Sequence, residues 1–207
     1  MKSDSTPIDV CVCGTSTPEY RTVAGREGDL EIACCREFGH QWQRNLSRTD
    51  HDNFHRQGLQ SSQLKINSTG ARHARRARID TLRRVNCVKE RSNNDCKLLD
   101  WGGAGEFIAA IQTDVAEVVG TELDHERIKF VTERHGLVMT HPSEVRRNFN
   151  PGYFDVITLF YVLEHFVNPF EELEQILELL NDGGILIIEV PNLDDWMLSV
   201  LHGYRQF

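Results

Sequence analysis

The 207-residue sequence contains no apolar run that approaches the roughly 20 residues needed to span a bilayer as a helix. Its first residues, MKSDSTPIDVCVCG, lack the apolar core of a secretory signal, so we expect a cytoplasmic protein. Repeats of collagen, coiled-coil or solenoid type are also absent, which excludes a fibrous or repeat protein. The composition is that of an ordinary globular protein, 40% hydrophobic and 26% charged, and the length allows one full domain plus a small module.

Basic residues are scarce in the C-terminal part of the chain. Residues 151–207 hold ten acidic residues and one basic residue, a net charge of −9, while residues 1–150 carry +1. Six arginines crowd residues 72–84, where they predict either a solvated helix face or a site for an anionic substrate such as a diphosphate. The balance of charge argues against a general nucleic-acid binder, although it leaves room for one basic face.

The first 35 residues hold four of the six cysteines: Cys11, Cys13, Cys34 and Cys35. In a chain without an export signal, such a cluster indicates metal ligands or free thiols before disulfides. A zinc ribbon needs two Cys-x-x-Cys-Gly knuckles, but here the first reads Cys-Val-Cys-Gly and Phe38 replaces the last cysteine of the second. Cys34, His40 or a slipped register could restore four ligands. The metal ligands therefore stay undetermined, between a zinc site and a degenerate remnant without metal.

Composition divides the chain into three parts. Residues 1–45 predict a small, loop-rich module that contains Cys, Gly and the strand-like segment DLEIACC. Residues 46–70 are polar without periodicity and predict a linker. Residues 71–207 predict the main domain, which begins with a helix from Ala71 to Val85 because apolar residues recur there at helical spacing.

From Lys97 onward, strand-like and helix-like segments alternate, which predicts a doubly wound, mostly parallel α/β sheet. Strands are expected at 97–101, 115–122, 137–140, 153–160 and 185–190, and helices at 106–112, 125–135 and 170–180. Asp124 is expected to cap one helix, and Asn168 followed by Pro169 to start another. The helix at 170–180 is expected to end at the Asn-Asp-Gly-Gly segment and to bury Phe170, Leu173, Ile176, Leu177 and Leu180.

Ligands of such sheets bind beyond the carboxyl ends of the strands. The loop after the first strand, Asp100 to Gly105, is rich in glycine, which lets backbone amides approach a ligand closely. Glu122 ends the second strand, 22 residues after Asp100, where a carboxylate can accept both hydroxyls of a ribose. Together these features predict a nucleoside-containing cofactor, with plain packing and capping as the alternative.

The segments LLDWGGAGEFI, VVGTELD and YFDVITLFYVLEHFVNPFEELEQILELLNDGGILIIEVPN resemble, in order and spacing, class I S-adenosylmethionine-dependent methyltransferases over residues 97–193. The Cys-containing head resembles a subgroup with a zinc-ribbon-like module, some of whose members methylate nucleotide-linked sugars. The resemblance implies a Rossmann-like fold, S-adenosylmethionine as cofactor, a small acceptor and zinc as an optional second cofactor. A methyltransferase-like binding module without turnover is the alternative, and a nicotinamide dehydrogenase is disfavoured.

The resemblance also implies roles for the cofactor-binding residues. Gly102, Gly103 and Gly105, beside Asp100, would line the methionine moiety of the cofactor. The loop DWGGAG is either one residue shorter than the family's D-x-G-x-G-x-G pattern, or Trp101 replaces the first glycine and Leu99 the acid. The Trp101 indole is expected either to block or to reshape the site.

The remaining implied roles fall on two other loops. Glu122 would bind the ribose and Leu123 would pack on the adenine, while the backbone carbonyl of Phe160 would accept from the cofactor's ammonium group. His165 lies in the loop where the acceptor would meet the methyl group, as a general base or as a side chain that shapes the pocket.

The family's sheet has seven strands, whereas only a short segment follows the fifth expected strand here. We therefore expect strands six and seven to be missing and the apolar segment Ile185–Val190 to form an exposed edge. The expected explanation is a piece of a longer protein; pairing of the edge with another copy, or with a partner that supplies the strands, is the alternative.

Overall fold

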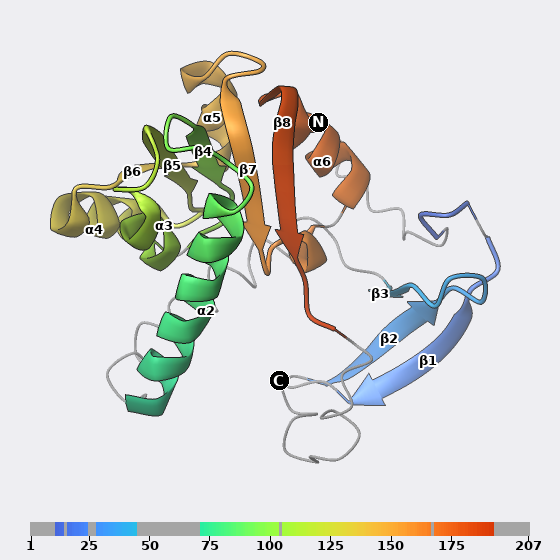
Figure 1. Cartoon of the computed structure of the whole chain (residues 1–207). Coiled ribbons are helices and arrows are strands. Elements are labelled where there is room, and N and C mark those ends of the chain that lie inside the picture. Colours follow the sequence, from blue (N-terminus) through green and yellow to red (C-terminus); the bar gives the residue numbers. More distant parts are fainter. Residues whose placement is uncertain are drawn as a thin grey trace. The chain divides into compact units, whose positions relative to one another are not determined.

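The computed structural model describes residues 11–14, 16–24, 28–44, 71–103, 105–166 and 168–192, without the side chains of residues 71–77 and Arg134 (Figure 1). The chain divides into two compact units, one of residues 1–54 with 192–207 and one of residues 55–191. The linker predicted at residues 46–70 lies outside the described residues.

The first unit contains a three-stranded antiparallel sheet in the order β1-β2-β3. Its strands are β1 (Glu19–Ala24), β2 (Asp29–Cys34) and β3 (Gln41–Gln43). Strand β2 corresponds to the strand-like segment DLEIACC of the sequence, and its register with β1 runs from Glu19 opposite Cys34 to Ala24 opposite Asp29. Ala33 of β2 and Cys35, which directly follows it, are buried.

The second unit is built on a five-stranded parallel sheet in the order β6-β5-β4-β7-β8 (Figure 1). The strands are β4 (Lys97–Asp100), β5 (Glu117–Thr121), β6 (Val138–Thr140), β7 (Phe154–Phe160) and β8 (Leu180–Glu189). The chain winds outward from β4 in one direction and returns to β7 on its other side. The predicted doubly wound, mostly parallel α/β fold is confirmed, with the strand order reversing between β4 and β7.

Five α-helices and one 3₁₀ turn are described: α2 (Ala71–Lys89), α3 (Glu106–Ile111), α4 (His125–His135), α5 (Pro142–Asn148), η1 (Leu163–His165) and α6 (Pro169–Leu177). Within the part of the chain that the structure describes, no helix combines the length and apolar character needed to cross a membrane. Asp124 caps α4 as expected, because its carboxylate accepts from the amides of Glu126 and Arg127, and Gly136 closes the helix at φ +64°.

Both faces of the parallel sheet are covered by helices. On one face, strand residues such as Leu98 and Val118 pack against apolar residues of α2, α3 and α4. On the other, Leu99 and Val119 pack against a cluster that includes Val145 of α5 and Ile176 of α6. Successive side chains of a strand point to opposite faces, so Leu98 and Leu99 belong to different cores, as do Val118 and Val119. Burial on both faces explains why the strands read as continuous apolar runs.

Three expectations from the sequence are wrong. Helix α6 ends at Leu177, and Leu180 is the first residue of β8 instead of the last of the helix. The Asn-Asp-Gly-Gly segment forms an irregular stretch of that strand instead of a loop. The cause is pairing, because the amide of Phe154 donates to the carbonyl of Leu179 and draws this segment into the sheet. Phe170 and Leu177 are not buried but 56% and 44% exposed.

The other differences concern helix ends. Asn168 precedes α6 as expected, but its side chain makes no capping hydrogen bond. Helix α5 was not expected, since it is short and buries only Val145. It starts where the ring of His141 accepts from the amide of Ser143 and Pro142 occupies the first turn.

Candidate cofactor site

Asp100, the last residue of β4, is 1% exposed at the centre of the sheet's carboxyl edge. The Thr158 hydroxyl donates to its Oδ1 over 2.7 Å, while Oδ2 is buried without a hydrogen-bond partner among the described residues. Burial raises the pKa of this carboxyl to about 6, although the Thr158 bond and the charge of Arg84 lower it. An acidic group in such a state is costly to the fold, which points to a role in binding.

The glycine loop after Asp100 is joined to both neighbouring strands. The Gly102 amide donates to Thr121 Oγ1, at the end of β5, over 2.8 Å. A Cβ on Gly102 would lie 2.8 Å from Val162 Cγ2, just beyond β7. A Cβ on Gly103 would overlap Asp100 Oδ2. The loop therefore needs glycine because protein atoms already occupy the space of a side chain at both positions.

Gly105 begins α3 with φ +91°, and a Cβ there would lie 3.0 Å from Val131 of α4. Trp101, expected either to block or to reshape the site, instead packs against the apolar core on the α5 and α6 face. The short loop accommodates its indole by directing it into the protein, and its amide donates to the Thr158 carbonyl over 2.8 Å.

Glu122 directly follows β5 and is 8% exposed. Its Oε1 accepts from the amides of Leu123 over 2.7 Å and Asp124 over 3.2 Å, and its Oε2 lies 3.4 Å from Arg127 Nε. These contacts hold the carboxylate in one position while leaving acceptor capacity, since two carboxylate oxygens offer about four lone-pair directions. Leu123, beside it, is 41% exposed.

The exit of β7 provides the third side of this edge. The Phe160 ring packs edge-on against Phe107 of α3, with centroids 5.0 Å apart, and the Arg84 guanidinium lies 4.7 Å above the Phe160 ring. Tyr161 follows with φ +58°, a strained conformation for a residue other than glycine. His165 ends the turn η1, is exposed and donates its amide to the carbonyl of Val162, the residue beside Gly102.

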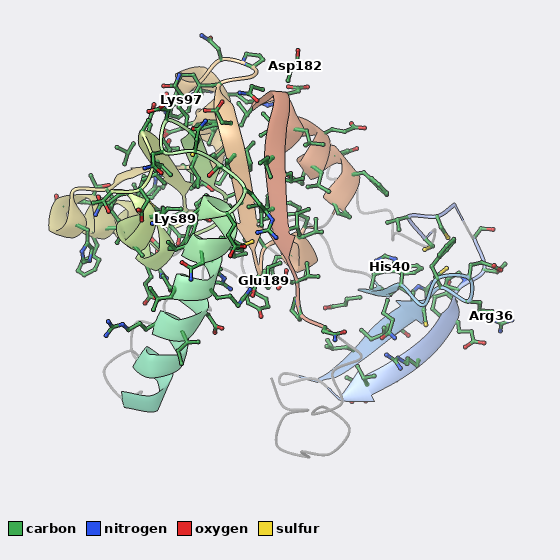
Figure 2. The ribbon with its side chains drawn as sticks, in the orientation of Figure 1. Arg36, His40, Lys89, Lys97, Asp182 and Glu189 are labelled. Atoms are coloured by element: carbon green, nitrogen blue, oxygen red, sulfur yellow. The ribbon has the colours of Figure 1, made fainter. Side chains whose placement is uncertain are left out.

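Glu189, labelled in Figure 2, lies at the end of β8. It forms ion pairs with two arginines of α2. Its Oε1 accepts from Arg83 Nη2 over 2.6 Å, and its Oε2 accepts from Arg84 Nε over 3.0 Å. Although burial acts to raise it, these bonds hold the pKa of Glu189 below its usual value. The sequence left two roles open for the arginine-rich segment, a solvated helix face or a site for an anionic substrate. Arg78 is exposed, as the solvated face requires. Arg83 and Arg84 instead connect the helix to the sheet through Glu189.

The predicted site residues thus follow three strands whose carboxyl ends share one edge. Gly103 lies against the Asp100 carboxylate, and the Gly102 amide binds Thr121 at the end of β5. Glu122 is the residue that follows Thr121. Sequence reasoning missed Thr121, Thr158 and Val162, which hold Asp100 and its loop. Their sequence signal is weak: Thr121 and Thr158 lie in the C-terminal parts of β5 and β7 and Val162 just after β7, and threonine and valine are ordinary residues in and near strands.

Comparison with known proteins agrees with this fold. Residues 71–206 match a family model described as a methyltransferase domain. Proteins named ubiquinone biosynthesis O-methyltransferase from Yersinia pestis (strain Pestoides F) and Yersinia pseudotuberculosis (serotype O:1b) are 26% identical over 136 residues, or 60% of this chain and 55% of each relative. The chain therefore spans about half the length of these curated relatives.

A crystal structure described as a SAM-dependent methyltransferase from Archaeoglobus fulgidus is similar to this chain with a TM-score of 0.51 and 20% identity. The similarity covers 69% of this chain and 63% of that one. It supports the Rossmann-like fold of the second unit.

Proposed function

Because the chain belongs to the methyltransferase-domain family, we propose that it binds S-adenosylmethionine at the Asp100 edge of the sheet and methylates a small-molecule acceptor. When bound, this cofactor supplies an electrophilic methyl group on a sulfonium sulfur. The observation that carries the proposal is the buried Asp100 Oδ2 without a hydrogen-bond partner among the described residues, directly beneath Gly103. A buried carboxylate beneath a glycine loop favours a ligand that places a positive group against that loop.

The chain's own residues divide the binding between them. Gly102, Gly103 and Gly105 would allow the methionine moiety close to the backbone, with Asp100 favouring its positive end. The Phe160 carbonyl, at the end of β7, would accept from the same ammonium group. The three glycines present no side chain to the ligand, and Asp100 supplies the charge complementarity.

The adjacent strand end supplies the nucleoside part of the site. The Glu122 carboxylate, already held by two amides, would accept from both ribose hydroxyls without having to be ordered first. The exposed Leu123 side chain would cover one face of the adenine. Binding at this carboxylate distinguishes the proposed cofactor from a ligand that lacks a ribose diol.

His165 is the proposed general base on the acceptor side. It is exposed at the end of η1, on the same exit loop as Val162, and a neutral imidazole can take a proton from an acceptor hydroxyl. Methyl transfer depends mainly on in-line positioning, so a residue that only shapes the pocket is the competing role. The relatives' names, ubiquinone biosynthesis O-methyltransferase, favour transfer to an oxygen atom of an acceptor other than the nucleotide-linked sugar suggested by the head module.

We also propose that residues 1–45 form a separate module and that residues 71–207 belong to the cofactor-binding domain. The separate three-stranded sheet and the family match from residue 71 support this division. The linker between them is proposed from sequence alone.

Calorimetric titration of the 207-residue chain with S-adenosylmethionine, S-adenosylhomocysteine and nicotinamide dinucleotides tests the cofactor. A methyl-transfer assay then follows release of S-adenosylhomocysteine with catechol-type phenols and nucleotide sugars as acceptors. The Glu122→Ala variant serves as the binding-deficient control, and His165→Ala and His165→Gln separate a base from a pocket residue through the pH profile of turnover.

Binding and turnover on any acceptor support the proposal, while binding without turnover on the whole panel favours the non-catalytic module. Nicotinamide binding without S-adenosylmethionine binding overturns it. If the turnover rate still changes with pH near neutrality in both His165→Ala and His165→Gln, His165 is not the base.

A further inference from the structure

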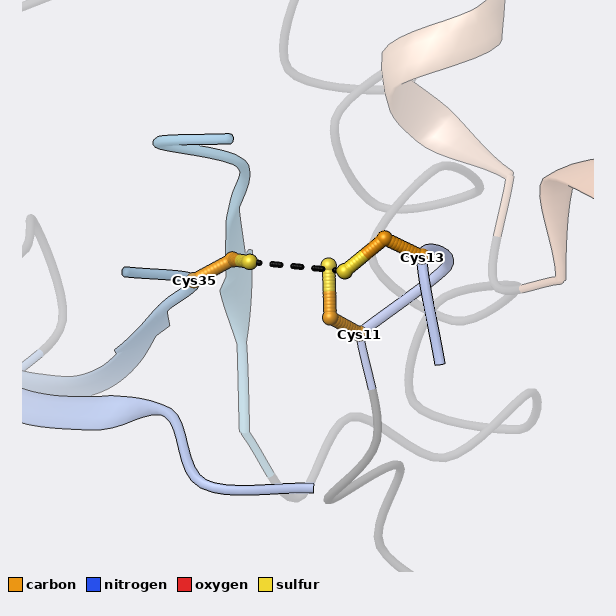
Figure 3. Close-up of side chains that lie close together, drawn as sticks. All are labelled: Cys11, Cys13 and Cys35. Carbon is orange, nitrogen blue, oxygen red and sulfur yellow. Dashed lines mark hydrogen bonds between the residues drawn. The ribbon is translucent and has the colours of Figure 1, made fainter. Parts of the chain in front are cut away.

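A group of thiols lies in the first unit, outside the cofactor site (Figure 3). The sulfur atoms of Cys11, Cys13 and Cys35 all lie within 4.8 Å of one another, and those of Cys13 and Cys35 are 3.5 Å apart. None of the three forms a disulfide among the described residues. His40 offers a fourth donor beside this group: its Nδ1 lies 3.6 Å from Cys11 Sγ, although its ring nitrogens are not within 4.8 Å of all three sulfurs.

Two tight turns present these donors in pairs. In the first, the Gly14 amide donates to the Cys11 carbonyl over 2.8 Å, with Gly14 at φ +88°. In the second, the Cys35 amide donates to the His40 carbonyl over 2.8 Å, and the Gly39 amide donates to the Cys35 carbonyl over 2.9 Å. Each turn thus holds two donor side chains on a fixed backbone, and the turns meet at the sulfur atoms.

The separations fit a tetrahedral zinc ion. Zn–S and Zn–N bonds of about 2.3 and 2.05 Å in a tetrahedron place two sulfurs about 3.8 Å apart, and a sulfur and a nitrogen about 3.6 Å apart. The observed separations are 3.5 Å for Cys13 and Cys35 and 3.6 Å for Cys11 and His40. For all four donors to reach one ion, the His40 ring has to move closer to the sulfurs, because it lies outside the group in which every pair of donor atoms is within 4.8 Å.

The same geometry excludes the other candidate ligands. Cys34 Sγ is directed at the carbonyl of its neighbour, Cys35, at 3.9 Å, and does not belong to the group. Phe38, at the expected knuckle position, is 77% exposed. The His40 ring stacks on Trp42, with centroids 5.2 Å apart and 20° between the planes.

We propose that the three grouped thiolates and the His40 imidazole bind one zinc ion that joins the two turns of the first unit. Binding forms three Zn–S bonds and one Zn–N bond, and the three thiol protons are released to solvent. Four protein ligands complete the tetrahedron, so the ion is structural and has no position for substrate. Burial of Cys11 and Cys35, which are 3% and 1% exposed, shields it from competing ligands.

Metal analysis of the full chain, purified without chelators from zinc-supplemented medium, tests the site. We expect about one zinc per chain, and replacement by Co²⁺ should give the thiolate charge-transfer and d–d bands of a tetrahedral site. Cys13→Ser and His40→Ala should each weaken Co²⁺ binding at least tenfold, whereas His40→Cys should retain it. Cys34→Ser is the matched control, because it removes a neighbouring thiol from outside the group.

If a variant fails to fold, alkylation of the cysteines in the wild-type chain still tests the site, because it needs no substitution. Zinc should protect Cys11, Cys13 and Cys35 while Cys34 reacts, and removal of zinc by a chelator should end the protection. A wild-type chain without bound zinc, equal loss of Co²⁺ binding in Cys34→Ser and Cys13→Ser, or a Cys13–Cys35 disulfide in freshly purified protein would each overturn the proposal.

Discussion

Gly103 lies directly against the carboxylate of Asp100, so that any side chain at residue 103 would overlap Asp100 Oδ2. The contact links the buried end of β4 to the loop that follows it. The Gly102 amide fixes the same loop to Thr121 of β5. A charged group and the backbone that covers it therefore form one structural unit, which the proposed cofactor would contact.

The Gly103→Ala variant tests this relationship. Since the new methyl group must displace Asp100 or the loop, we expect a loss of about 1–3 kcal/mol in the free energy of unfolding and weaker binding of S-adenosylhomocysteine. Urea unfolding and calorimetry measure the two effects. Gly136→Ala is the control: it carries the strain of φ +64° but has open space, so it should cost stability without affecting the ligand.

Asp100 predicts an unusual dependence of stability on pH. Its pKa of about 6 in the folded protein lies above its ordinary value of 3.8, so the folded state keeps a proton that the unfolded state loses. The free energy of unfolding should therefore fall as pH rises from 4 to 6, by up to ~3 kcal/mol, and stay reduced above that range.

The Asp100→Asn variant lacks this loss and should gain stability relative to wild type as pH rises from 4 to 7, as urea unfolding at several pH values would measure. Thr158→Val removes the hydroxyl that lowers the pKa of Asp100, so the loss should extend to higher pH. A constant difference between Asp100→Asn and wild type across this range would contradict the prediction.

Glu122→Ala should weaken binding of S-adenosylhomocysteine by about 1.5–3 kcal/mol, the contribution of hydrogen bonds to a charged group. Calorimetry with a folded variant is the measurement. Glu133→Ala removes an exposed carboxylate from the far part of α4 and should leave the affinity unchanged. Unchanged affinity in Glu122→Ala would refute the ribose contact.

Strand β8 forms one edge of the parallel sheet in the described part of the chain, and Ile188 and Val190 are 39% and 47% exposed. A ten-residue edge strand offers more unpaired backbone than the three-residue β6 at the other edge. We expect the 207-residue chain to self-associate in sedimentation velocity, and Ile188→Lys to reduce that association.

Val138→Lys, at an exposed position of β6, is the control and should not alter the sedimentation profile. A monodisperse wild-type monomer would contradict the prediction for β8.

The sequence by itself determined the alternation of strands and helices, because apolar runs such as Phe154–Phe160 and caps such as Asp124 are local signals. It also located the glycine loop and Glu122, since their spacing follows from one strand–helix–strand unit. The position of Trp101 was decided by tertiary packing, because the core below the loop had room for its indole.

Only the tertiary structure decided which side chains hold Asp100 and which thiols meet. Thr158 lies 58 residues from Asp100 in the chain, and Cys35 lies 22 residues from Cys13, so neither contact has a local signal. Strand pairing brings Asp100 opposite Thr158, and two turns bring the sulfur atoms together. Strand pairing also places Leu180 in β8 and not in the preceding helix, because its pairing with Phe154 of β7 outweighs the helical tendency of the preceding segment.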